Sequence, residues 1–171
     1  MTRTQSALAG VFLAWIGHSS TALALDVTPL NPADYQSFVG NWTPADAPLC
    51  AAIGSAEAWN RVLHPAAVMG DRRPFAPPSE FWERHAVLLF ARVVPGGGQA
   101  SALRLAGAER SPDAIDIVVA VTPPPPSSWT MKSWLAVAVP KPLPPHVGFL
   151  ENGKRICSLE PASGHWLSPA Q

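Results

Sequence analysis

Proline limits the length of every regular element that this chain can form. Twenty of its 171 residues are proline, more than twice the usual share of roughly 5%. Proline has no backbone N–H and interrupts both helix interiors and central strands. Because 47% of the residues are hydrophobic, the chain can still bury a core. We therefore expect short elements joined by many turns.

Short apolar stretches bounded by proline or glycine occupy the second half of the chain. Residues 86–94 form a run that is apolar apart from Arg92, whereas residues 114–121 alternate with the period of two that is typical of a half-buried strand. The predicted strands are 86–94, 101–106, 114–121, 134–139, 147–150 and 155–158. The pattern predicts a β-rich α+β fold of five or six short antiparallel strands with one or two short helices.

Two helices and one loop are predicted between residues 55 and 84. Ser55 is a suitable N-cap for a helix over 56–63, and a second helical turn is expected over 79–84. Glycine and proline in residues 69–78 indicate a loop between them.

The pair Asn152-Gly153 predicts a hairpin between the last two strands. Asparagine and glycine tolerate the positive φ angles that a type I′ turn requires twice. This turn would place Glu151 opposite Lys154 and Phe149 opposite Ile156.

The N-terminus has the three-part layout of a secretory signal peptide. Arg3 precedes an uncharged apolar run over residues 7–17, and small residues stand at Ala22 and Ala24. The run is shorter than the roughly 20 residues that a membrane-spanning helix needs. We expect cleavage after Ala24 and a periplasmic or secreted bacterial protein without stable membrane insertion. A retained membrane anchor is the alternative.

Two cysteines, Cys50 and Cys157, agree with export. Disulfides persist in oxidising compartments, and this pair would link the start of the folded region to its end. Two unrelated buried thiols are the alternative.

The composition also predicts the boundaries along the chain. They are a signal peptide over 1–24, an irregular N-terminal arm over 25–49, a folded domain over 50–160 and a polar tail over 161–171.

Charge and motifs argue against several functions. Twelve basic residues balance twelve acidic ones, so binding to nucleic acid by phosphate neutralisation is not expected. The chain has no G-x-S-x-G or S-x-x-K motif and no histidine or cysteine spacing typical of a metal site. We expect a non-enzymatic protein without cofactor or metal. A small periplasmic hydrolase that brings a serine to His85 or His146 in space is the alternative.

The best binding candidate is a stiff proline-rich loop that ends in an aromatic residue. Four prolines at 123–126 precede Ser127, Ser128 and Trp129, and such a loop loses little freedom on binding. The candidate binding residues are Pro124, Pro125, Pro126, Trp129 and Trp134. These tryptophans also fit a carbohydrate- or peptidoglycan-binding module, and Trp129 has a further alternative as a core anchor.

Residues 50–142 resemble one known protein family. The helix start Ile53-Gly54-Ser55-Ala56-Glu57-Ala58-Trp59, the paired glycines 97–98 and the lead-in at 130–133 are similar to motifs of the C-terminal domain of the protease-complex-subunit PrcB family. The resemblance implies an exported, non-catalytic accessory protein that associates with a protease and stabilises it.

Overall fold

The computed structural model describes residues 27–40, 47–96, 102–122, 125–163 and 166–168. The expected signal peptide, the paired glycines 97–98 and Pro124 lie outside these residues. The described chain is strand-rich, with two α-helices and eleven strands in three sheets.

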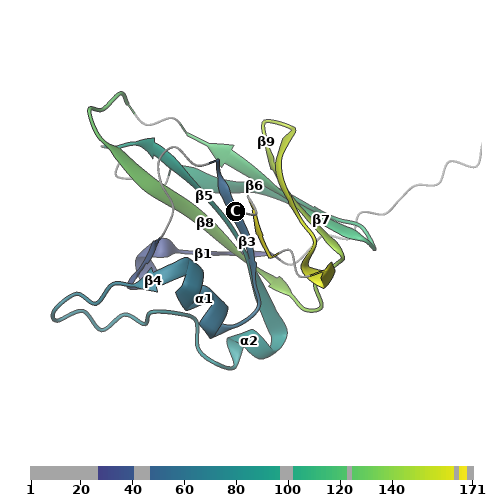
Figure 1. Cartoon of the computed structure of the whole chain (residues 1–171), viewed down its shortest axis with the longest axis horizontal. Helices are drawn as coiled ribbons and strands as arrows, with labels where there is room; N and C mark the ends of the chain where they lie inside the picture. The colour runs from purple at the N-terminus through teal and green to yellow at the C-terminus, as the bar shows by residue number, and fades with distance from the viewer. Residues whose placement is uncertain (1–26, 41–46, 97–101, 123–124, 164–165, 169–171) are drawn as a thin grey trace, which may run out of the picture.

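A five-stranded antiparallel sheet forms the middle layer (Figure 1). Its strands, in spatial order, are β1 (Thr28–Leu30), β8 (Thr130–Pro140), β5 (His85–Pro95), β3 (Leu49–Ile53) and β11 (Leu167–Ser168). Two of them, β5 and β8, have eleven residues each and pair along their whole length.

A four-stranded sheet packs against one face of this middle layer. Its strands are β10 (Lys154–Leu159), β9 (His146–Glu151), β7 (Ala114–Val121) and β6 (Leu103–Arg110). The expectation of purely antiparallel strands is wrong for one pair, because β7 and β9 run parallel. The chain leaves this sheet after β7, passes through β8 in the other sheet and returns as β9. Such a crossover permits parallel pairing.

Small elements cover the opposite face of the middle layer, where Figure 1 shows the two helices. They are α1 (Ala56–Val62), α2 (Phe81–Arg84) and a two-stranded sheet of β2 (Ser37–Val39) and β4 (Leu63–Pro65). Two 3-10 turns, η1 (Pro32–Asp34) and η2 (Pro161–Ser163), complete the described elements. Among all the residues that the structure describes, no helix has the length and apolarity needed to cross a bilayer.

The position of each sheet explains the two strand patterns in the sequence. In β5, alternate residues from Ala86 to Phe90 face the four-stranded sheet, and those from Val87 to Ala91 face the helices. Because both faces of β5 are buried, both sets are apolar. In β7 the residues Ile115, Ile117 and Val119 are buried and those between them are partly exposed. The alternating pattern therefore marks a sheet with one solvent face.

The prediction of a helix after Ser55 is confirmed. The Ser55 hydroxyl accepts a hydrogen bond from the backbone N–H of Ala58 at 3.1 Å, which satisfies one of the free donors of the first turn. The helix ends at Val62, one residue earlier than expected, because Leu63 has an extended backbone and begins β4.

The hairpin at Asn152-Gly153 is confirmed, with φ angles of 52° and 75°. Glu151 pairs with Lys154 as predicted. The expected pairing of Phe149 with Ile156 is wrong, because the register shifts between Arg155 and Cys157 and places Phe149 opposite Cys157. Ile156 is the extra residue of a bulge, which no turn rule predicts.

More strands form than the five or six predicted. The segment 25–49, expected to be irregular, contributes β1 to the middle sheet and β2 to the small sheet. These strands have three residues each, which is too short for a period of two to be recognised. Tertiary pairing rather than local pattern selects them.

Replacing Gly153 by alanine is expected to lower the free energy of unfolding by about 1 kcal/mol, because its positive φ disfavours a side chain. Gly107→Ala is the matched control: an added Cβ meets nothing within 4 Å at either site, and only Gly153 has a positive φ. Urea unfolding of both variants measures the difference. Equal effects at the two glycines would contradict the assigned turn.

Candidate functional site

The residues predicted to bind a partner divide between the surface and the core. Trp129 is 55% exposed, and Pro125 and Pro126 are exposed as well. Trp134 is 7% exposed, whereas Pro124 lies outside the described residues. Three of the five candidates are therefore available at the surface.

The prediction that Trp134 belongs to a binding surface is wrong. Trp134 lies in β8 on the face that α1 covers, and its indole packs edge-on against Trp59 with ring centroids 6.1 Å apart. Because both faces of β8 are buried, its apolar sequence does not distinguish a core tryptophan from an exposed one. Trp134 is a core residue.

Trp129 extends the ladder between β5 and β8. Beyond the last strand pair, Pro95 with Thr130, the backbone N–H of Gly96 donates to the carbonyl oxygen of Trp129 at 2.8 Å. The backbone N–H of Trp129 donates to the hydroxyl of Ser127 at 3.3 Å. These bonds fix the backbone that carries the indole.

The indole of Trp129 lies across the Cα of Gly96. A Cβ atom added at Gly96 would overlap Cδ2, Cε2 and Cε3 of the ring, so a residue with a side chain does not fit beneath it. Gly96 is buried, although Pro95 before it is exposed. The aromatic ring is thus supported on one side, while more than half of Trp129 remains accessible to solvent.

The residues that flank Trp129 in the sequence are uncharged. Residues 125–131 contain no acidic or basic side chain, and Met131 is also exposed. An accessible indole between such residues suits the apolar side chains of a protein or the C–H face of a neutral sugar. We call Trp129 with its support Gly96 the tryptophan platform.

A second surface feature includes most of the loop that the sequence predicted over residues 69–78. Residues 66–77, which we call the clamped loop, connect β4 to the segment before α2 and project from the body of the molecule in Figure 1. Two core indoles hold one end of this loop: Nε1 of Trp59 donates to the carbonyl of Phe75 at 2.8 Å, and Nε1 of Trp82 donates to that of Pro77 at 3.1 Å.

Gln36 holds the middle of the clamped loop, on both sides of its tip. Its side-chain nitrogen donates to the carbonyls of Asp71 (3.3 Å) and Arg73 (2.5 Å), and its side-chain oxygen accepts from the N–H of Val68 (3.0 Å). Gln36 is 6% exposed, so this network satisfies a buried amide. Sequence reasoning missed Gln36, because its partners are 32 to 37 positions away and no local pattern marks them.

An ion pair within the clamped loop adds to this network. The guanidinium of Arg73 donates to the carboxylate of Asp71 through Nε, at 2.8 Å and 3.1 Å, and through Nη2. It also reaches the carbonyl of Ala33 in η1 at 2.5 Å. These hydrogen bonds lower the pKa of Asp71. The ion pair is therefore intact at pH values above the ordinary pKa of aspartate, and it is lost as the pH falls through the lowered pKa of Asp71.

The two histidines of the hydrolase alternative contact groups other than serine. Nδ1 of His85 lies 3.3 Å from the carbonyl of Phe81, and the two rings stack. His146 lies 3.9 Å from the carboxylate of Glu160. Within the described ranges, no group of three or more histidine, cysteine or acidic side chains is gathered as a metal ion would require.

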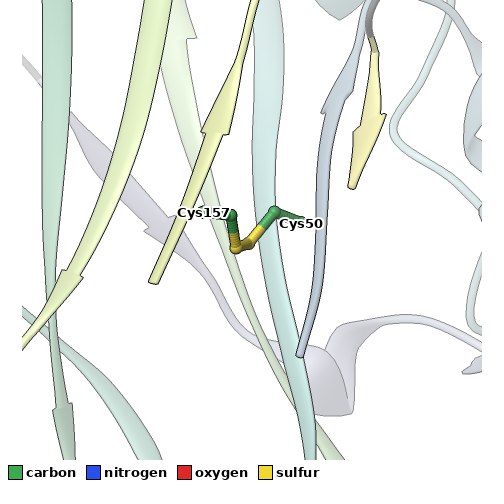
Figure 2. The surroundings of a disulfide bond; sticks show 2 residues. All are labelled: Cys50 and Cys157. Carbon is green, nitrogen blue, oxygen red and sulfur yellow. A yellow bond between two sulfur atoms is a disulfide. The ribbon is translucent and has the colours of Figure 1, made fainter. Parts of the chain in front are cut away.

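The predicted pairing of Cys50 with Cys157 is confirmed. The disulfide joins β3 of the middle sheet to β10 of the four-stranded sheet (Figure 2), across a Cα–Cα distance of 6.5 Å. Both cysteines belong to the core between the two sheets. The bond therefore links the two sheets covalently across the core.

Comparison with protein-family models, with curated proteins and with solved structures found no match for this chain.

Proposed function

We propose that this chain is an exported, non-enzymatic accessory module that binds a partner protein through the tryptophan platform. The observation that carries the proposal is the indole of Trp129, which is supported by Gly96 and still more than half exposed. Tryptophan dominates many binding interfaces, and a ring already fixed in place loses little freedom on association.

Two observations support export. The apolar run at residues 7–17 has the length of a signal-peptide core. The bond between Cys50 and Cys157 is stable in an oxidising compartment such as the periplasm. The partner class that the PrcB-like motifs imply is a protease, which this chain would stabilise.

Trp129→Ala is expected to weaken the complex by about thirtyfold, equivalent to roughly 2 kcal/mol. Gly96→Ala is expected to have a similar effect although it keeps the tryptophan, because the added Cβ displaces the ring. The measurement is capture of partner proteins from periplasmic extract on the immobilised chain, with mass spectrometry, followed by titration of the captured protein.

Trp166→Ala is the matched control, because Trp166 is 43% exposed and lies next to β11 rather than at the platform. Binding that survives Trp129→Ala and Gly96→Ala would remove the platform from the interface. A failure of the wild-type chain to retain any protein would contradict the accessory function itself.

A second candidate function follows from the exposure of the indole and the uncharged residues that flank it in the sequence. The C–H face of a neutral sugar stacks on an open indole, so a carbohydrate- or peptidoglycan-binding module fits the same geometry. Quenching of tryptophan fluorescence by soluble peptidoglycan fragments, present in the wild type and absent in Trp129→Phe and Trp129→Ala, would favour it over protein binding.

A further inference from the structure

The tip of the clamped loop exposes two adjacent apolar side chains. The N–H of Asp71 donates to the carbonyl of Val68 at 3.1 Å and closes a turn in which Gly70 has a φ of +82°. Val68 is 58% exposed and Met69 is fully exposed. The turn thus presents a small convex apolar surface to solvent.

The backbone beneath this tip is already ordered. The N–H of Val68 is bound by Gln36, and so are the carbonyls of Asp71 and Arg73 beyond the turn. The N–H of Gln36 also donates to Pro74, and the carbonyl of Gln36 accepts from Ala66. A tip held in this way loses little conformational freedom when it enters another molecule.

The charges at the tip leave one exposed cation. Arg73 pairs with Asp71, so that this carboxylate is already neutralised. Arg72 is exposed, and it forms no ion pair with any described residue. A complementary surface would therefore carry carboxylates beside the place that receives the apolar tip.

We infer that the clamped loop is a second docking element, and that Met69 enters an apolar pocket bordered by carboxylates on the partner protein. A convex tip requires a concave partner, and the unbranched thioether of methionine adapts to irregular apolar pockets. The inference rests on the proposed function, because it concerns the same partner. It assigns a contact that does not involve the tryptophan platform.

Photo-crosslinking tests the inference, because residues 25–171 contain two methionines, Met69 and Met131. The secreted chain is produced with photo-methionine in a Met131→Leu background, which leaves the probe at position 69. The Met69→Leu background leaves it at 131, two residues from Trp129, where an adduct reports contact at the tryptophan platform instead of the clamped loop. Each form is irradiated in periplasmic extract and, separately, with vesicles of phosphatidylethanolamine and phosphatidylglycerol.

The expected result is an adduct from position 69 on the protein that the tryptophan platform also retains, at a residue within an apolar pocket bordered by aspartate or glutamate. Adducts from position 131 alone, or from position 69 to lipid alone, would overturn the inference. Absence of any complex would overturn both this inference and the proposed function. A complex that forms without an adduct at position 69 would overturn the inference alone.

Charge variants give an independent readout on the captured partner. Arg72→Glu is expected to weaken binding on the order of tenfold, whereas Arg72→Lys retains most of it. Glu57→Lys is the control for general electrostatics, because Glu57 is exposed on α1. Equal affinity of Arg72→Glu and the wild type would contradict a carboxylate border.

The contribution of the Gln36 hydrogen bonds is tested with Gln36→Met, which removes the amide and keeps the side-chain length. Faster hydrogen exchange at the N–H of Val68 and severalfold weaker binding are expected, although Met69 is unchanged. Ser37→Ala is the milder variant if Gln36→Met does not fold, since it removes only the hydroxyl bond to the carbonyl of Phe75. Unchanged affinity in a variant whose loop exchanges faster would show that a rigid loop is not needed.

Discussion

Trp59→Ala is expected to lower the free energy of unfolding by about 3–5 kcal/mol. Trp59 is fully buried, and its ring centroid lies 5.2 Å from that of Tyr35, 6.0 Å from that of Trp82 and 6.1 Å from that of Trp134. The change removes a fully buried indole from the core between the middle sheet and the small elements, and also the donor to the carbonyl of Phe75. Urea unfolding followed by far-UV circular dichroism measures the loss.

Trp129→Ala is the matched control for this prediction. It removes the same side chain from an exposed position, and we expect a change below about 1 kcal/mol. Similar losses at both positions would mean that Trp129 belongs to the core and that the tryptophan platform is not a free surface.

Removal of the disulfide by Cys50→Ala with Cys157→Ala is expected to cost about 2–5 kcal/mol. The cysteines are 107 positions apart, and a closed loop of about 100 residues restricts the unfolded chain by up to roughly 4.7 kcal/mol. Because the bond also joins the two sheets, its loss removes a covalent link across the core. The measurement is the difference in urea unfolding between the oxidised wild type and the double variant.

A thiol assay gives the control for this second prediction. The exported protein, denatured without reductant, should show no reactive thiol, and two should appear after reduction. Two reactive thiols before reduction would mean that the bond does not form in the compartment where the protein resides. Equal stability of the wild type and the double variant would mean that the bond contributes little to folding.

Local features of the fold were predictable where a short stretch of sequence decides them. The cap at Ser55 and the turn at Asn152-Gly153 depend on neighbouring residues, and both form as expected. The alternation over Ala114–Val121 matches β7 residue for residue. The pairing of Cys50 with Cys157 was also predictable, because two cysteines allow a single bond.

Features that depend on distant partners were not predictable. The bulge at Ile156 changes which residue faces Phe149, and the parallel pairing of β7 with β9 depends on where β8 lies. The burial of Trp134 follows from the layer of small elements over β8. Each depends on contacts between segments that are separate in the sequence.

The candidate sites also have some features that the sequence predicted and others that only the tertiary structure revealed. Composition and the order of neighbouring residues identified a proline-rich loop ending in Trp129 as a possible recognition element. This was possible because the stiffness of proline and the size of tryptophan do not depend on the fold. The support that Gly96 gives to its indole, and the hold of Gln36 on the clamped loop, appeared only in the tertiary structure. Gln36 is an ordinary polar residue in the sequence. Its role arises because folding places its amide against backbone groups more than 30 positions away, where a buried polar group must be satisfied.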